Sequence, residues 1–170
     1  MTPPRIRPPG TSDERTQLTG WLDMQRALVH YKCAGLSEED ARRVLLPTSP
    51  RMTVAGLVSH LRWVEHCWFE VLFSGRGQAD NPQFGPEDGA DYDPGDTPLA
   101  TLLEQYAYQC AASDAVIAAS SLDDLGVDEE YGGHGLTLRW ILFHLIEEVA
   151  RHAGHLDLLR EQLDGVTGYY

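Results

Sequence analysis

Apolar residues recur at helical spacing in four long segments of the chain, and no segment alternates in the manner of a β-strand. These segments cover residues 13–33, 53–73, 98–119 and 137–163. A spacing of three or four residues places apolar side chains on one face of an α-helix. The pattern therefore predicts an all-α protein built as a four-helix bundle.

The segments outside these helices differ in composition. Residues 1–12 contain four prolines and predict an extended N-terminal arm. Ser37 precedes an acidic turn and predicts a short extra helix that ends near Leu45, before two prolines. Residues 74–96 and 120–135 predict one or two long crossover loops, and the first is of the kind that often covers a site. We expect residues 13–170 to form a single domain.

The start of the third long helix is also predicted by local sequence. Thr97 is a suitable N-cap residue, and Pro98 suits the first helical position because its missing N–H would have no partner there. On the preceding helix, His66 falls on the polar side and is expected at the surface.

Charge restricts the classes of partner. The chain has 13 Lys and Arg against 26 Asp and Glu, which gives a formal net charge of −13. Such a surface repels nucleic-acid phosphates and anionic membranes. No apolar run approaches the roughly 20 residues that span a bilayer, and no signal-peptide core follows Met1. We therefore expect a cytoplasmic protein that binds neither nucleic acid nor membrane.

The three cysteines predict neither a disulfide framework nor a structural zinc knuckle. Cys33, Cys67 and Cys110 lie far apart, each within a helical segment. Cys67 is not expected to act as a nucleophile, because only the adjacent His66 is a candidate for lowering its pKa.

Four polar residues share a narrow face of the last predicted helix. His144, Glu148, His152 and His155 lie three or four residues apart, beside the apolar stripe. Burying a lone carboxylate is costly, whereas a divalent cation with an imidazole beside it removes the penalty. Glu148 and His152, at a chelating spacing, are therefore candidate metal ligands. An ordinary surface contact between the two side chains is the alternative.

The helix over residues 53–73 supplies a third candidate ligand. His60 lies on its apolar side, near Leu57 and Val64. A histidine without a metal at this position is the alternative. Three ligands from His60, Glu148 and His152 would leave open positions for water or substrate, as in catalytic rather than structural sites.

Several motifs together carry a resemblance to a known superfamily. They are GLVSHL at residues 56–61, VE at 64–65, LRW at 138–140, EEVARHAGH at 147–155, LRE at 159–161 and DG at 164–165. Over about residues 14–168 the chain resembles the DinB/YfiT-like superfamily, in its mini-circle-protein branch. It is similar there to the N-terminal domain of mycothiol-dependent maleylpyruvate isomerases.

The resemblance implies a four-helix fold that binds a divalent metal, zinc first, with nickel or iron as alternatives. Many members carry a histidine where this chain has Glu148, and the mycothiol-dependent relatives carry glutamate. The ligand positions therefore transfer to His60, Glu148 and His152. The isomerase relatives have an additional C-terminal domain, whereas this sequence stops at Tyr170.

The resemblance also implies a thiol-dependent S-transferase or isomerase with a low-molecular-weight thiol as cosubstrate. A metal-bound thiol has a lowered pKa and attacks an electrophile at neutral pH. A non-catalytic metal-binding stress or sensor protein, active as a homodimer, is one alternative. A metal-dependent hydrolase, in which His155 or Glu65 acts as base, is another.

Four residues around the predicted site have expected supporting roles. His144, His155 and Glu65 are candidates to orient a metal ligand or to move a proton. Arg26 is a candidate contact for an anionic thiol. Ordinary packing is the alternative for each.

Overall fold

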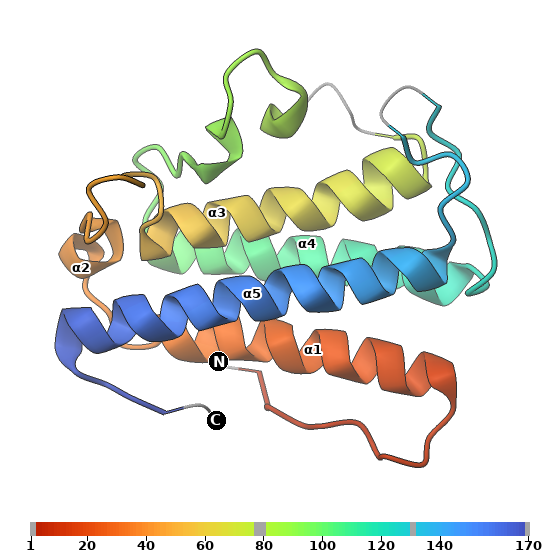
Figure 1. The fold of residues 1–170 in the computed structure, drawn as a ribbon, viewed down its shortest axis with the longest axis horizontal. Helices are drawn as coiled ribbons and strands as arrows, with labels where there is room; N and C mark the ends of the chain where they lie inside the picture. Colours follow the sequence, from red (N-terminus) through yellow and green to blue (C-terminus); the bar gives the residue numbers. More distant parts are fainter. Residues whose placement is uncertain (1–2, 77–80, 130–131, 169–170) are drawn as a thin grey trace. The chain divides into compact units, whose positions relative to one another are not determined.

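The named elements of the protein are all helices in the part of the chain that the structure describes. The computed structural model describes residues 3–76, 81–129 and 132–168 (Figure 1). Helix accounts for 62% of the structure, and these residues contain five α-helices and no strand. The all-α prediction is confirmed, in keeping with a DinB-type bundle. Within the same residues, no helix has the length and apolar character needed to cross a membrane.

The α-helices lie close to their predicted positions. Their bounds are α1, Glu14–Cys33; α2, Glu38–Arg42; α3, Val54–Glu65; α4, Leu99–Ala119; and α5, Leu138–Asp164.

Two predicted helix ends are wrong by a few residues. The short helix ends at Arg42 and not near Leu45, because Val44 and Leu46 are exposed and offer no buried face for another turn. Helix α4 begins at Leu99 with Pro98, not Thr97, as its N-cap. The backbone of Pro98 is still extended, with ψ 148°.

The segment expected as one regular helix over residues 53–73 changes its winding half-way. Helix α3 passes into a π-helix, η1, over His66–Phe73. In keeping with this wider winding, Ser74 Oγ donates to the carbonyl of Phe69, five residues earlier, at 2.7 Å. The apolar pattern could not predict this change, because η1 is apolar on most sides and too short for one period to stand out.

The chain divides into two compact units. The first contains residues 1–57 and 142–170, and the second contains residues 58–141. The extent of a single domain over residues 13–170 stays a prediction.

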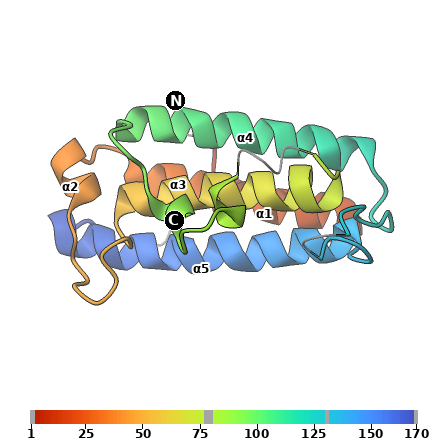
Figure 2. The same cartoon turned by 90° about the horizontal axis from the view of Figure 1, so that it is seen from above.

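In the first unit, α1 packs against α5. Met24 and Leu28 of α1 form a buried cluster with Ala153 of α5. Arg160 of α5 donates from Nη1 to the carbonyls of Lys32 and Ala34, both at 2.8 Å, and so satisfies carbonyls at the end of α1. Helix α2 lies at the same end of the unit as the C-terminus of α5 (Figures 1 and 2).

The N-terminal arm lies along α1. Residues 3–12 form no helix, and Arg5 stacks over the ring of Tyr31 at 3.7 Å. Gly20 allows Pro8 to approach, since a Cβ at that glycine would lie 2.7 Å from the Pro8 Cβ. The described part of this segment is therefore in contact with α1.

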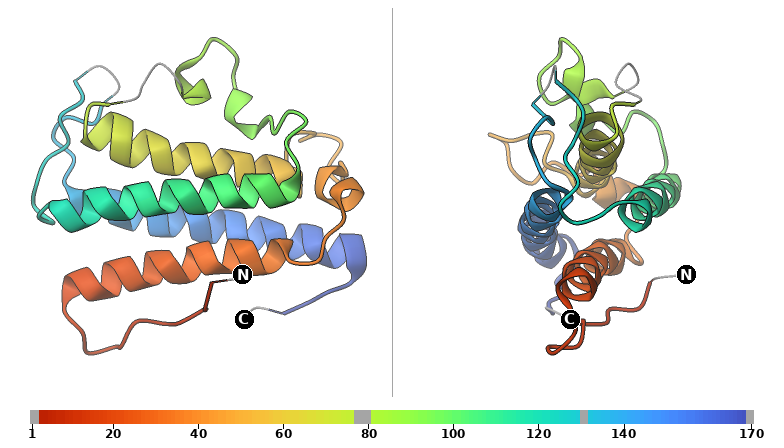
Figure 3. Two further views of the ribbon diagram at one scale, coloured as in Figure 1. Left: turned by 180° about the vertical axis from the view of Figure 1, so that it is seen from behind. Right: turned by 90° about the vertical axis from the view of Figure 1, so that its right-hand side faces the viewer.

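In the second unit, α4 lies beside α3 and η1. Arg62 of α3 donates to Gln105 of α4 at 3.0 Å, and Gln109 donates to Glu70 of η1 at 2.8 Å. Two 3-10 turns, η3 (Pro82–Phe84) and η4 (Ala90–Tyr92), lie over α3 (Figures 1 and 3). The described part of the predicted loop over residues 74–96 therefore covers a helix face.

Candidate metal centre

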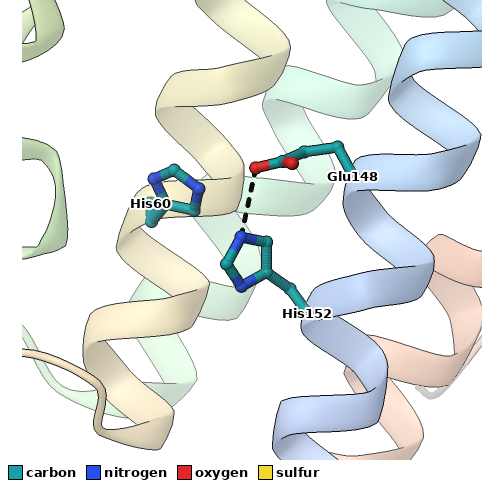
Figure 4. A group of neighbouring side chains, drawn as sticks. All are labelled: His60, Glu148 and His152. Carbon is teal, nitrogen blue, oxygen red and sulfur yellow. Dashed lines mark hydrogen bonds and ion pairs between the residues drawn. The ribbon is translucent and has the colours of Figure 1, made fainter. Parts of the chain in front are cut away.

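Glu148 and His152 lie one turn apart on α5, with their side chains in contact. His152 Nε2 is 3.1 Å from Glu148 Oε1, the contact marked by the dashed line in Figure 4. Only 9% of Glu148 and 5% of His152 are exposed. The other oxygen of Glu148 pairs with Arg151 at 3.4 Å. The contact is therefore buried and not the surface pair that sequence left open.

The two other histidines on this face of α5 are half-buried. His155 Nδ1 lies 3.3 Å from Nδ1 of His152, with the rings edge to face. Burial lowers the pKa of His155, and the neighbouring His152 and Arg151 lower it further. Burial also lowers the pKa of His144, partly offset by Glu148 and Glu147. At both positions the lowered pKa favours the neutral imidazole, which is the form that accepts a proton.

In the second unit, His60 is held on α3 by two side chains from the covering segment. Its Nδ1 is 2.6 Å from Asp91 Oδ2, and the ring of Tyr92 stacks on it with centroids 4.0 Å apart. His60 is 7% exposed and Asp91 5%. A histidine whose Nδ1 donates to a carboxylate presents Nε2 as the basic nitrogen, the arrangement common behind metal ligands.

Asp91 is ionised despite its burial. Burial by itself raises the pKa of this carboxyl group, but hydrogen bonds from His60 and Gln83, together with the charge of His60, leave the pKa below its ordinary value. Gln83 Nε2 donates to the same oxygen at 2.9 Å. The segment itself is tied to α3 by Ser59, whose hydroxyl donates to the carbonyl of Asp91 at 2.8 Å.

Asp91, Gln83 and Tyr92 were not predicted as site residues. They belong to a loop that is rich in acidic residues and has no helical period, so nothing in the sequence separates Asp91 from its neighbours. The one feature of the sequence that pointed to this segment was its length, because long loops often cover a functional site.

Two predicted supporting residues have structural partners. Glu65 is fully buried on α3 and accepts a weak hydrogen bond from the thiol of Cys110 at 3.9 Å. Arg26 is buried on α1 and pairs with Asp23 at 3.2 Å.

His66 was expected at the surface, and this is only partly correct. It is half-buried at the start of η1, because Asn81 lies 3.1 Å from its Nδ1 and Trp63 packs against its ring. Burial raises the pKa of Cys67 to about 12, and Asp91 and Asp128 add to the effect. As predicted, this thiol is no nucleophile.

The donor atoms of the predicted ligands suit a divalent transition metal. His60 is buried in the second unit, and Glu148 and His152 are buried in the first. Two imidazole nitrogens and one carboxylate oxygen are typical of zinc in catalytic sites, and also accept nickel or iron.

A family model described as mycothiol-S-transferase matches residues 17–165. The chain belongs to the mycothiol-S-transferase family. The match extends from α1 into the turn after α5 and includes all three candidate ligands. It bears out the resemblance to the DinB/YfiT-like superfamily. No curated protein and no solved structure matches the chain.

Proposed function

We propose that this member of the mycothiol-S-transferase family is a metal-dependent transferase that joins a small thiol, mycothiol first, to an electrophilic small molecule. The observation that carries the proposal is the family match over residues 17–165. The buried histidines and carboxylate described above support it, because a transferase of this kind needs a place to activate the thiol. The match favours this function over the sensor and hydrolase alternatives.

The proposed metal ligands are His60 through Nε2, Glu148 through its carboxylate and His152 through Nε2, with zinc as the proposed metal. A divalent cation held by three protein ligands supplies a coordination position at which a thiol loses its proton near pH 7. One carboxylate and two imidazole nitrogens are donors suited to such an ion.

The remaining residues of the site orient the ligands and receive the proton. Asp91 holds Nδ1 of His60, and His155 lies against Nδ1 of His152. His155 is neutral and half-exposed, so we assign it the role of accepting the thiol proton. The sulfur then forms a bond to the electrophilic carbon, and the leaving group departs with the electrons of its bond. His144, Glu65 and Arg26 keep their predicted supporting roles as proposals.

The proposal is tested by thiol-dependent turnover. The purified protein is loaded with zinc or nickel and incubated with monochlorobimane and, in turn, mycothiol, bacillithiol and glutathione. We expect consumption of mycothiol to exceed that of the other two thiols and to stop after metal removal. Absence of turnover with every thiol and both metals would refute the transferase.

The ligand assignment is tested separately by metal content. His152→Ala should lose most of the bound zinc, whereas His30→Ala, a half-buried histidine of α1 outside the site, should retain it. Equal zinc content in the two variants would contradict the assignment.

We also propose that the protein is a cytoplasmic homodimer. The homodimer is tested by light scattering during gel filtration, where a mass twice the 18.9 kDa of one chain is expected. A mass of one chain at micromolar concentration would contradict it.

A further inference from the structure

A cavity of about 550 Å³ lies within the second unit. Its volume is in the range of about 300–1,000 Å³ that is usual for small-ligand sites. Its wall is formed by α3, by the first turns of α4 and by the segment that carries η3 and η4. The principal side chains of this wall are Ser59, Arg62, Trp63, Asn81, Phe84 and Gln105.

Arg62 is the one fixed positive charge on this wall. Its guanidinium lies over the ring of Trp63 at 4.1 Å and donates one hydrogen bond to Gln105 at 3.0 Å. A guanidinium has five N–H donors, so most of its donor capacity is not used by Gln105. Arg62 is half-buried, and this burial lowers the pKa of its guanidinium.

The described hydrogen-bond partner of Arg62 is neutral, whereas six other arginines among the described residues pair with a carboxylate. Acidic residues outnumber basic ones two to one, and other arginines have carboxylate partners. The paired arginines are Arg26, Arg42, Arg43, Arg139, Arg151 and Arg160. Among the described residues, no carboxylate pairs with Arg62. A half-buried charge whose described hydrogen-bond partner is neutral is stabilised by an anion supplied from outside.

From this arrangement we propose that the cavity is a binding site for a small organic carboxylate, with Arg62 as its anchor. A guanidinium matches the two oxygens of a carboxylate. The apolar part of the wall, including Phe84 and Leu102, suits a ligand with an apolar body. Asp93, an exposed residue on the same wall, repels anions through its negative charge. This repulsion is larger for a small, multiply charged anion than for a singly charged acid with an apolar body.

The cavity shares one wall with the support of His60. In the segment over residues 90–93, Ala90 and Asp93 line the cavity, whereas Asp91 and Tyr92 contact His60. The site is nevertheless defined by the second unit alone, so its test is independent of the proposed metal and thiol chemistry.

Benzoate is the probe for this site, and benzamide is its neutral counterpart. Binding is followed by NMR through the Nε–H signal of Arg62 and by tryptophan fluorescence. We expect saturable binding of benzoate and, because a charged hydrogen bond is lost, affinity for benzamide weaker by about tenfold or more. Inorganic phosphate should bind more weakly than benzoate. Equal binding of benzoate and benzamide, tighter binding of phosphate, or no binding at all would overturn the proposal.

Two variants and one control locate the anchor. Arg62→Gln removes the positive charge. Gln105→Glu places a carboxylate of the same size beside Arg62, where it competes with the benzoate carboxylate. Each variant should therefore weaken benzoate binding by about tenfold. Arg42→Gln, on a helix of the other unit, should bind as the wild type does. Unchanged affinity in Arg62→Gln and Gln105→Glu would refute Arg62 as the anchor, even if the cavity bound benzoate.

Discussion

Three side chains fix the orientation of His60 before any metal arrives. The carboxylate of Asp91 forms a hydrogen bond with Nδ1 of His60, and Gln83 donates to that same carboxylate. Tyr92 stacks on the imidazole and restrains the plane of its ring. A ligand that is already oriented loses little conformational freedom when it binds a metal. The covering segment is therefore part of the proposed metal centre and not a passive loop.

The contribution of Asp91 can be measured as metal affinity. In Asp91→Ala, His60 loses its hydrogen-bond partner, and zinc affinity should fall by about 10- to 100-fold. Asp91→Asn keeps an acceptor but loses the charge, so its affinity should lie between those of the alanine variant and the wild type. Competition with a chelating indicator gives these values. Asp93→Asn, two residues away and exposed, is the matched control, and equal affinities in Asp91→Ala and this control would contradict the role.

The buried thiols should be unreactive in the folded protein. Burial raises the pKa of Cys33 and of Cys67 from 9.0 to about 12, so both are protonated at pH 8. A disulfide reagent should label only the partly exposed Cys110 until the chain is unfolded, and Cys110→Ser should abolish that labelling. Rapid labelling of Cys67 in the native protein would contradict this expectation.

The raised pKa values of Cys33 and Cys67 also make the stability of the fold depend on pH under alkaline conditions. Above pH 9 the unfolded chain releases thiol protons that the folded chain retains up to about pH 12. The free energy of unfolding should therefore fall as pH rises through this window.

Sequence predicted the residues of α5 better than those of the covering segment. Glu148 and His152 could be found because a helical period beside an apolar stripe places a polar pair toward the core. Asp91 could not be found, because its contact with His60 depends on the path of an irregular loop.

At the scale of elements, a loop closely approaches the end of η1. The backbone N–H groups of Val127 and Asp128 donate to the carbonyls of Phe73 and Leu72, at 3.1 and 3.2 Å. A Cβ at Gly133 would lie 2.1 Å from the carbonyl oxygen of Leu72. This position therefore requires glycine for space.

Gly133→Ala should lower the free energy of unfolding by about 1–3 kcal/mol, because backbone must move to admit the methyl group. Gly154→Ala is the matched control. This exposed glycine in the middle of α5 has no neighbour within 4 Å of an added Cβ, and alanine should stabilise the helix by about 0.5–1 kcal/mol. Chemical denaturation of both variants measures the changes. If Gly133→Ala left the free energy of unfolding unchanged, the close approach of this loop to the carbonyl of Leu72 would be contradicted.

The elements themselves were largely predictable. Four long segments with a helical period became α1, α3 with η1, α4 and α5. The period did not predict the π-helix, because the position of a wider turn depends on which neighbours the side chains pack against.

At the scale of the whole molecule, metal binding should stabilise the fold. His60 and the pair on α5 are far apart in sequence, so the unfolded chain offers no comparable site. A ligand that binds only the folded state adds about 2.7 kcal/mol when its free concentration is 100 times its Kd. Zinc should therefore raise the thermal midpoint of the wild type and leave that of His152→Ala unchanged. An equal shift in both proteins would place the zinc elsewhere.

Net charge at this scale agrees with a small-molecule substrate. A chain of charge −13 is poorly suited to polyanions, whereas mycothiol-type chemistry needs no electrostatic attraction over a large surface. The family match and the net charge are therefore both consistent with a small-molecule partner.

In the proposed function, one metal ion held by His60, Glu148 and His152 binds the thiol that reacts. X-ray absorption at the zinc edge tests it most directly. Without thiol, the first shell should contain only nitrogen and oxygen, and addition of mycothiol should introduce one sulfur at about 2.3 Å. An unchanged nitrogen and oxygen shell at saturating mycothiol would contradict the account.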